Sequence, residues 1–306
     1  MIALLAPGQG SQTPGMLNPW LELDGVAERL GAWSELTGLD LTRLGTTAEA
    51  EEIKDTAVTQ PLVVALSLIA AEELDRRVTV PADAPVAGHS VGELAAAAVA
   101  GALSPDDAVA LAAVRGREMA AACALEPTGM SAMLGGDEAA VLAHLEKLGL
   151  DPANRNATGQ IVAAGKTGAL EQLAAEPPEG ARVRPLPVAG AFHTRFMAPA
   201  KEAMAKHAED VKTNDATRPL LSNADGAVVS EAGEILRRLV DQVTNPVRWD
   251  SCMATLAERG VEAVVEFPPA GTLTGLVRRE LKGVQTVALK TPADLDKVAE
   301  LIGSAA

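Results

Sequence analysis

The amino-acid sequence predicts an α/β fold, in which helices cover both faces of a mostly parallel β-sheet and a small unit is inserted. Short apolar segments alternate with helical ones along most of the chain, as expected for buried parallel strands. A Gly-x-Ser-x-Gly segment stands between a predicted strand and a predicted helix. Residues 123–188 change to a βαββαβ order, which is typical of the ferredoxin-like split motif.

Composition narrows the classes of partner. The chain has 306 residues, enough for a large domain with an insertion, and a net charge of −15. This charge and the scarcity of aromatic residues disfavour nucleic acid, and the charge also disfavours an anionic membrane.

Cys123 and Cys252 lack metal-ligand spacing, so we expect reduced thiols and no metal site. Residues 1–6 lack a basic leader and the longest apolar run, residues 62–71, is short, so we expect a cytoplasmic protein.

The N-terminal part begins with a short buried strand at residues 1–6. It ends in the loop Pro7-Gly8-Gln9-Gly10-Ser11-Gln12, which exposes several backbone N–H groups but lacks the Gly-Lys-Ser/Thr ending of a phosphate loop. Residues 20–56 are expected to form short surface helices. Thr59-Gln60-Pro61 is then expected to open an apolar helix that runs to residue 74, with Pro61 near its start.

The segment Gly88-His89-Ser90-Val91-Gly92 follows a predicted strand at residues 84–87 and precedes a predicted helix at residues 93–100. In such a turn the serine hydroxyl projects from the end of the strand, and the helix N-terminus points free N–H groups at it. The pattern favours a nucleophilic serine, Ser90, over an ordinary strand-to-helix turn. The loop at residues 7–12 is the best candidate for a second oxyanion-binding N–H group.

A further helix is predicted to start at Ser104-Pro105-Asp106-Asp107, with a serine N-cap, proline at the first position and acids in the first turn. Arg115 lies on the apolar face of this helix together with Leu111 and Met119. A buried arginine keeps its proton and needs an anionic partner. From spacing alone, that partner is equally a carboxylate of the protein or a carboxylate of the substrate, held bidentately.

The remaining elements complete the domain prediction. In the insertion we expect strands at residues 129–134, 153–156, 160–164 and 181–186 and helices at 137–148 and 167–175. After it we expect strands at residues 220–222, 263–267 and 286–289 and helices at 195–208, 232–242, 251–259 and 272–281. Residues 1–122 and 189–306 therefore form the predicted catalytic domain, and residues 123–188 the small one.

A serine nucleophile needs a general base, and the chain offers four histidines. His207 lies in a charged helix end, His144 lies within a helix of the small domain, and the His89 side chain should point away from its neighbour Ser90. His193 lies in a loop at a strand-to-helix junction and is the base by elimination. No acidic residue has a clear claim to complete a triad, and a backbone carbonyl would suffice to orient the imidazole.

Several short motifs occur along the chain in the order in which one known family has them. They are Gly8-Gln9-Gly10-Ser11-Gln12, Thr59-Gln60-Pro61, Gly88-His89-Ser90-Val91-Gly92-Glu93, Arg115-Gly116-Arg117-Glu118-Met119, Gly190-Ala191-Phe192-His193, Ser222-Asn223, Asn245-Pro246-Val247-Arg248-Trp249 and Leu273-Thr274-Gly275-Leu276. In these the chain resembles malonyl-CoA:acyl carrier protein transacylases and the acyltransferase domains of polyketide synthases. The resemblance covers nearly the whole chain and implies an α/β-hydrolase-like large domain with a ferredoxin-like insertion.

The resemblance also implies a reaction and its residues. Malonyl-CoA would acylate Ser90, with His193 as base, and the phosphopantetheine thiol of acyl carrier protein would then take the malonyl group. Arg115 would bind the malonyl carboxylate. The backbone N–H groups of Gln9 and Val91 would form the oxyanion hole.

Further residues follow from the same resemblance. The carbonyl of Gln242 would orient His193, while Gln60, His89 and Asn154 would line the pocket. Phe192 stands where α-methyl-accepting relatives usually have Ser, so its bulk favours malonyl. No cofactor is implied beyond the carrier-bound phosphopantetheine, and a monomer is expected.

Acyl carrier proteins are acidic, so docking on this acidic chain calls for a local basic patch. Arg278, Arg279 and Lys282 on one predicted helix are the candidates, although a solvated helix face is the commoner explanation of such residues. Two other functions stay open: a serine thioesterase, in which water takes the acyl group, and a non-catalytic carrier-binding scaffold. The sequence does not distinguish fatty-acid from polyketide synthesis.

Overall fold

The computed structural model describes residues 1–305 and contains two β-sheets. The larger sheet has the strand order β11-β10-β1-β2-β7-β8. Its strands are β1 (Ile2–Ala6), β2 (Val86–Gly88), β7 (Leu220–Leu221), β8 (Val228–Val229), β10 (Ala263–Glu266) and β11 (Gln285–Ala288). All neighbours pair in parallel except β8, which is antiparallel to β7, so the mostly parallel sheet is confirmed.

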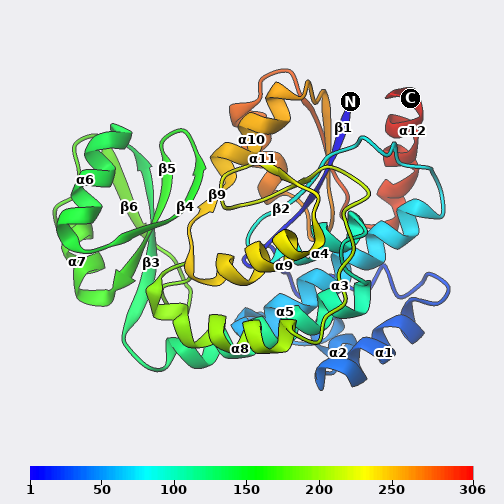
Figure 1. Ribbon diagram of the computed structural model, residues 1–306, viewed down its shortest axis with the longest axis horizontal. Helices are drawn as coiled ribbons and strands as arrows, with labels where there is room; N and C mark the ends of the chain where they lie inside the picture. The colour runs from blue at the N-terminus through cyan, green and yellow to red at the C-terminus, as the bar shows by residue number, and fades with distance from the viewer. Residues whose placement is uncertain (306) are drawn as a thin grey trace.

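Helices cover both faces of this sheet (Figure 1). They are α1 (Val26–Thr37), α2 (Leu41–Thr46), α3 (Thr56–Asp75), α4 (Gly92–Val99), α5 (Pro105–Cys123), α8 (Ala198–Ala208), α9 (Ala232–Asp241), α10 (Trp249–Glu258), α11 (Thr272–Glu280) and α12 (Leu295–Ala305). Short 3₁₀ turns are η1 (Glu52–Lys54), η2 (Arg195–Met197), η3 (Gln242–Thr244) and η4 (Pro292–Asp294). Leu4 and Leu5, successive residues of β1, belong to different hydrophobic clusters, as the alternation of side chains in a two-sided buried strand requires.

Helix α3 starts earlier than the sequence predicted. It begins at Thr56, where the Asp55 carboxylate accepts a hydrogen bond from the Ala57 N–H, and Pro61 lies inside the helix. The prediction placed Pro61 near the start because proline favours the first turn, but the Asp55 cap already supplies a start signal upstream. The 20-residue helix is long and apolar enough to cross a membrane by length and composition, but most of that stretch is buried inside the protein.

The helices between residues 20 and 56 were predicted to lie on the surface, but several of their side chains are buried. Leu30 and Trp33 of α1 and the preceding Trp20 are almost fully buried. The Trp33 indole N–H donates to the Asp106 carboxylate at 2.8 Å, which ties α1 to the start of α5. This segment is therefore part of the main core.

The smaller sheet has the order β6-β3-β5-β4-β9. It comprises β3 (Thr128–Gly135), β4 (Asp151–Ala157), β5 (Gln160–Lys166), β6 (Ala181–Pro185) and β9 (Val247–Arg248), with α6 (Glu138–Leu148) and α7 (Thr167–Ala175). Strands β3 to β6 pair antiparallel in the ferredoxin-like order, as predicted. The two-residue strand β9 joins β4 in parallel from outside residues 123–188, and it is too short to leave a sequence signal.

The two faces of the small sheet have different neighbours. Met133 and Ile161 pack with Leu145 and Leu173 of helices α6 and α7. Met130 and Val162, on the other face, belong to the main core cluster of the large domain. That second face therefore lies against the large domain, as the arrangement of the two lobes in Figure 1 shows, and a pocket opens between them.

Candidate active site

The turn after β2 holds Ser90 in the left-handed region, with φ of 55°. A Cβ at Gly88 would lie 2.1 Å from backbone atoms of Gly92, and a Cβ at Gly92 would lie 2.3 Å from the carbonyl oxygen of Ala6. Both positions therefore require glycine, which explains the Gly-x-Ser-x-Gly spacing physically. The Ser90 N–H donates to the Asn223 side-chain oxygen at 2.8 Å, which helps to hold the turn.

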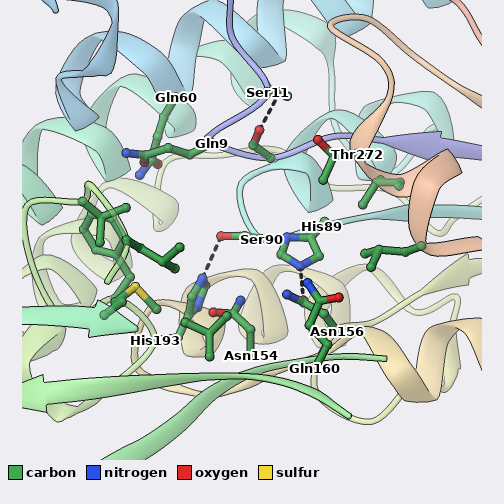
Figure 2. Close-up of a pocket in the computed structure, with 18 of the residues that line it drawn as sticks. Gln9, Ser11, Gln60, His89, Ser90, Asn154, Asn156, Gln160, His193 and Thr272 are labelled. Atoms are coloured by element: carbon green, nitrogen blue, oxygen red, sulfur yellow. Dashed lines mark hydrogen bonds between the residues drawn. The ribbon is translucent and has the colours of Figure 1, made fainter. Parts of the chain in front are cut away.

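A histidine faces the serine hydroxyl. The Nε2 atom of His193 lies 2.7 Å from Ser90 Oγ (Figure 2). Its Nδ1 lies 2.9 Å from the backbone carbonyl oxygen of Gln242. Because a carbonyl only accepts, Nδ1 carries the proton and Nε2 is free to accept the serine proton. Burial lowers the pKa of His193 to about 3, with the charge of Arg115 acting in the same direction. The imidazole is therefore neutral at neutral pH.

Arg115 reaches the same hydroxyl from α5. Its guanidinium donates to the side-chain oxygens of Gln60 at 2.7 Å and Gln242 at 2.8 Å, and one nitrogen lies 3.3 Å from Ser90 Oγ. No carboxylate of the described residues forms an ion pair with Arg115, so the protein-carboxylate alternative finds no direct partner there. Burial lowers the pKa of Arg115 to about 10, and the nearby Glu93 opposes that effect. The site thus holds a cation whose hydrogen-bond partners are two neutral amides and the Ser90 hydroxyl.

Three polar groups behind the serine have no role in the sequence analysis: Glu93, Asn223 and the side chain of Gln242. The Glu93 carboxylate accepts from the Asn223 N–H at 2.6 Å and from the Gln242 side-chain amide. Burial raises the pKa of Glu93 to about 8, against the effect of these donors and of Arg115. The available signal was an acid, Glu93, directly before the apolar run 94–100, where a charge on a buried face is costly.

The two backbone groups expected to bind an oxyanion lie on adjacent loops. A Cβ at Gly8 would lie 2.5 Å from the carbonyl oxygen of His89, so the loop carrying Gln9 packs directly on the serine turn. Within residues 1–305, no protein group accepts a hydrogen bond from the N–H of Gln9 or Val91. The N–H of Ser90 itself is occupied by Asn223. The amides of Gln9 and Val91 are therefore available to a ligand.

A pocket of about 370 Å³ lies in front of Ser90. We call one wall the elbow side; its members are Gln9, Gln60, Ser90, Arg115 and His193. We call the opposite wall the small-sheet side; its members are Met130, Asn154, Gln160, Val162 and Leu186. Figure 2 shows labelled residues of both walls around the Ser90 hydroxyl. Phe192 is nearly buried, and it also lines this space.

His89 lines the pocket but is directed away from the Ser90 hydroxyl, as expected. Its Nε2 lies 2.9 Å from the Asn156 side-chain oxygen (Figure 2). Its ring packs edge-on against Trp249. Burial lowers the pKa of His89. Asn156 was not identified from the sequence, since nothing in its strand pattern distinguishes it from Asn154, two residues earlier on β4.

The three candidate docking residues do not share one environment. Arg279 lines the pocket and donates to the side-chain oxygen of Gln160 at 2.6 Å, linking α11 to the small sheet. Arg278 and Lys282 are exposed, as Arg279 is, and the Lys282 ammonium lies 3.4 Å from the Arg278 carbonyl oxygen. Of the three, only Arg279 borders the pocket.

Together these groups define a class of protein. A serine on a strand-to-helix turn, a neutral histidine on its hydroxyl and two available backbone N–H groups are the parts of an enzyme that moves acyl groups through an acyl-serine. The family model for the acyl transferase domain matches residues 4–304. The chain belongs to this acyltransferase family.

Individual relatives cover the chain almost from end to end. A curated malonyl CoA-acyl carrier protein transacylase of Mycobacterium tuberculosis is 63% identical over 98% of this chain and 100% of its own length. The crystal structure of MCAT from Mycobacterium tuberculosis has a TM-score of 0.95 at 62% identity, covering 98% of this chain and 99% of that one. A type II PKS acyl-carrier protein in complex with its malonyl-transacylase matches with a TM-score of 0.91 at 29% identity, over 98% and 99% of the two chains.

Proposed function

We propose that this protein transfers a malonyl group from malonyl-CoA to the phosphopantetheine thiol of an acyl carrier protein, through a malonyl ester of Ser90. The observation that carries the proposal is the short distance from one hydroxyl to two groups: 2.7 Å to the imidazole of His193 and 3.3 Å to the guanidinium of Arg115. In a malonyl thioester only one methylene separates the reacting carbonyl from the carboxylate. A cation that binds this carboxylate must therefore lie close to the nucleophile.

In the acylation step Ser90 Oγ attacks the thioester carbonyl carbon while its proton moves to Nε2 of His193. The oxygen that becomes negative accepts hydrogen bonds from the N–H groups of Gln9 and Val91. A donor lost from such a hole costs on the order of 3 kcal/mol of barrier. The carbon–sulfur bond then breaks, and the departing CoA sulfur takes the proton from Nε2. The products are malonyl-Ser90 and CoA thiol.

The second half-reaction repeats these steps with a different nucleophile. Nε2 of His193 accepts the proton of the carrier thiol, whose sulfur attacks the Ser90 ester. When the ester bond breaks, Ser90 Oγ recovers the proton. The carbonyl of Gln242 holds the Nδ1–H throughout, so the imidazole keeps its orientation without a carboxylate partner.

Arg115 selects acyl groups that carry a negative charge. The malonyl carboxylate would receive hydrogen bonds from the planar guanidinium, whose orientation Gln60 and Gln242 hold. Phe192 limits the room beside the acyl α-carbon and so disfavours an α-methyl group. His89 and Asn154 complete the lining of this space.

We extend the proposal to the whole chain. Residues 1–122 and 189–306 form the catalytic domain, and residues 123–188 the small domain that covers the thioester. The protein acts as a cytoplasmic monomer without a cofactor of its own, and it supplies extender units to fatty-acid or polyketide synthesis. Its carrier protein docks at the pocket entrance, with Arg278, Arg279 and Lys282 as candidate contacts.

The test compares the fate of the malonyl group with and without holo acyl carrier protein. We expect malonyl transfer to the carrier thiol to be much faster than hydrolysis of malonyl-CoA. Rapid hydrolysis that carrier protein does not divert would support a thioesterase instead. A protein that neither hydrolyses nor transfers any acyl-CoA would contradict both enzymatic functions and favour a carrier-binding scaffold.

A further inference from the structure

The groups that hold Arg115 lead to a buried acid. The Gln242 side-chain oxygen accepts from Arg115 at 2.8 Å, and its nitrogen donates to Glu93, to the Ser90 carbonyl oxygen at 2.9 Å and to Asn223. The amide orientation is thus set by a cation on one side and acceptors on the other. Glu93 is the only charged group among these acceptors.

We propose that Glu93 is a positioning residue, which fixes the orientation of the Gln242 amide and so holds the Arg115 guanidinium ready for the substrate carboxylate. The inference rests on the proposed function and adds a determinant of acyl selectivity to it. Glu93 is 5% exposed and lies behind the turn, where it touches neither the pocket nor the serine hydroxyl. Its effect on the substrate would therefore pass through Gln242.

The polarity of the hydrogen bonds explains why an acid is required at this position. Both carboxylate oxygens accept: one from the backbone N–H of Asn223 at 2.6 Å, the other from the Gln242 amide. A glutamine has one acceptor. If its oxygen stays on Asn223, its NH₂ group faces the NH₂ group of Gln242. To avoid that contact Gln242 must rotate, and it then presents its own NH₂ group to Arg115.

The separation between the two charges has a second consequence. A carboxylate in direct contact with Arg115 would occupy the nitrogens that the substrate needs. With one neutral amide between them, the ionised form of Glu93 offsets the buried positive charge while the guanidinium stays available. This arrangement fits a site that must bind and release a carboxylate in each cycle.

Glu93→Gln tests the proposal, because it keeps the side-chain size and removes an acceptor and the charge. The measurement is the specificity for acylation of Ser90, kcat/KM, with malonyl-CoA and with acetyl-CoA, above pH 8 where Glu93 is ionised. We expect the malonyl-to-acetyl ratio to fall at least about tenfold, as for the loss of a charge-assisted hydrogen bond. A disturbed His193 would slow both substrates equally, so the ratio reports on Arg115.

A matched control is Glu266→Gln. Glu266 is also a fully buried carboxylate, and it accepts from the N–H groups of Gly271, Leu273 and Thr274 at the start of α11. This variant should lower the melting temperature and leave the malonyl-to-acetyl ratio unchanged. Glu93→Asp keeps the charge with a shorter reach, so its ratio should fall less than that of Glu93→Gln.

The outcomes separate the inference from the proposed function. A wild-type protein that malonyl-CoA does not acylate would overturn the proposed function itself. A wild-type protein that is acylated, with an unchanged ratio in Glu93→Gln, would overturn only the role of Glu93, even if both rates fell. Should Glu93→Gln fail to fold, Glu93→Asp decides: a lowered ratio supports the proposal, and a wild-type ratio contradicts it.

Discussion

The two walls of the pocket hold their polar groups in different ways. On the elbow side Ser90, Arg115 and His193 each hydrogen-bond Asn223 or Gln242. These two partners in turn both donate to the Glu93 carboxylate. On the small-sheet side, no protein group in the described part of the chain hydrogen-bonds the side-chain amide of Asn154, which faces the pocket among Met130 and Val162. Gln160 of the same wall accepts a hydrogen bond from Arg279, so it is the Asn154 amide that is left to a ligand there. The elbow side is preorganised for chemistry.

The contrast has a structural origin. The elbow side is built on the ends of short parallel strands within the main core, where backbone and side chains are closely packed. The small-sheet side is one face of an antiparallel sheet whose other face carries α6 and α7 (Figure 1). Changes on the elbow side should therefore abolish or redirect the reaction, and changes on the small-sheet side and pocket rim should adjust it.

The largest effect is expected for Ser90→Ala. Loss of the nucleophile should lower kcat for malonyl transfer by at least about 10⁴-fold, because no other group can form the acyl intermediate. The measurement is carrier malonylation by the purified variant, with thermal unfolding as a check on the fold. Activity within tenfold of wild type would remove Ser90 from the mechanism.

Arg115→Gln should act on one substrate class. We expect kcat/KM for malonyl-CoA to fall by roughly 10²-fold, in line with about 3 kcal/mol for a lost charged contact, while acetyl-CoA is affected far less. Equal losses for both substrates would mean that Arg115 supports the structure and does not recognise the carboxylate. Arg117→Gln is the control, since this neighbouring arginine is largely exposed and pairs with Glu118.

The pH dependence of kcat/KM should show that the general base, His193, is neutral. Burial and Arg115 lower the pKa of His193 to about 3 from 6.5, so protonation should not reduce kcat/KM as the pH falls through 6.5. The unfolded chain binds this proton near pH 6.5 and the folded chain near pH 3, so this group makes stability decrease as the pH falls between these values. An acid limb of kcat/KM near 6.5 would contradict the neutral, buried imidazole.

A smaller effect is expected at Phe192, which lines the pocket. Phe192→Ser opens room beside the acyl α-carbon, and the ratio of methylmalonyl-CoA to malonyl-CoA use should rise by about tenfold, since one methyl group is worth about 1–3 kcal/mol. Competition between the two thioesters in one reaction measures this ratio directly. An unchanged ratio would place the selection against the methyl group elsewhere.

The smallest effect is expected at the pocket rim. Charge reversal at Arg278 and Lys282 should raise KM for the carrier protein several-fold and leave malonyl-CoA hydrolysis unchanged, since rim charges chiefly affect association. Reversal at Arg279 should affect both reactions, because it alone of the three lines the pocket. Equal losses in transfer and hydrolysis on reversal of Arg278 and Lys282 would mean that these two residues do not act in docking.

Much of this arrangement follows from local sequence signals. The glycines around Ser90, the Ser104 cap and the βαββαβ order each specify a local geometry that the structure contains. The residues missed are those whose position depends on distant packing. Asn223 reaches the serine turn from 133 positions away, and the Gln242 side chain reaches Glu93 across 149. No periodicity records such contacts, and a two-residue strand such as β9 leaves no pattern either.

A malonyl ester at Ser90, from which the carrier thiol then takes the malonyl group, is the central step of the proposed reaction. Intact mass, recorded after addition of malonyl-CoA and again after addition of holo acyl carrier protein, tests both parts. We expect one malonyl adduct, absent in Ser90→Ala, and its complete transfer to the carrier. An adduct that only water removes, or no adduct with any acyl-CoA, would contradict the account.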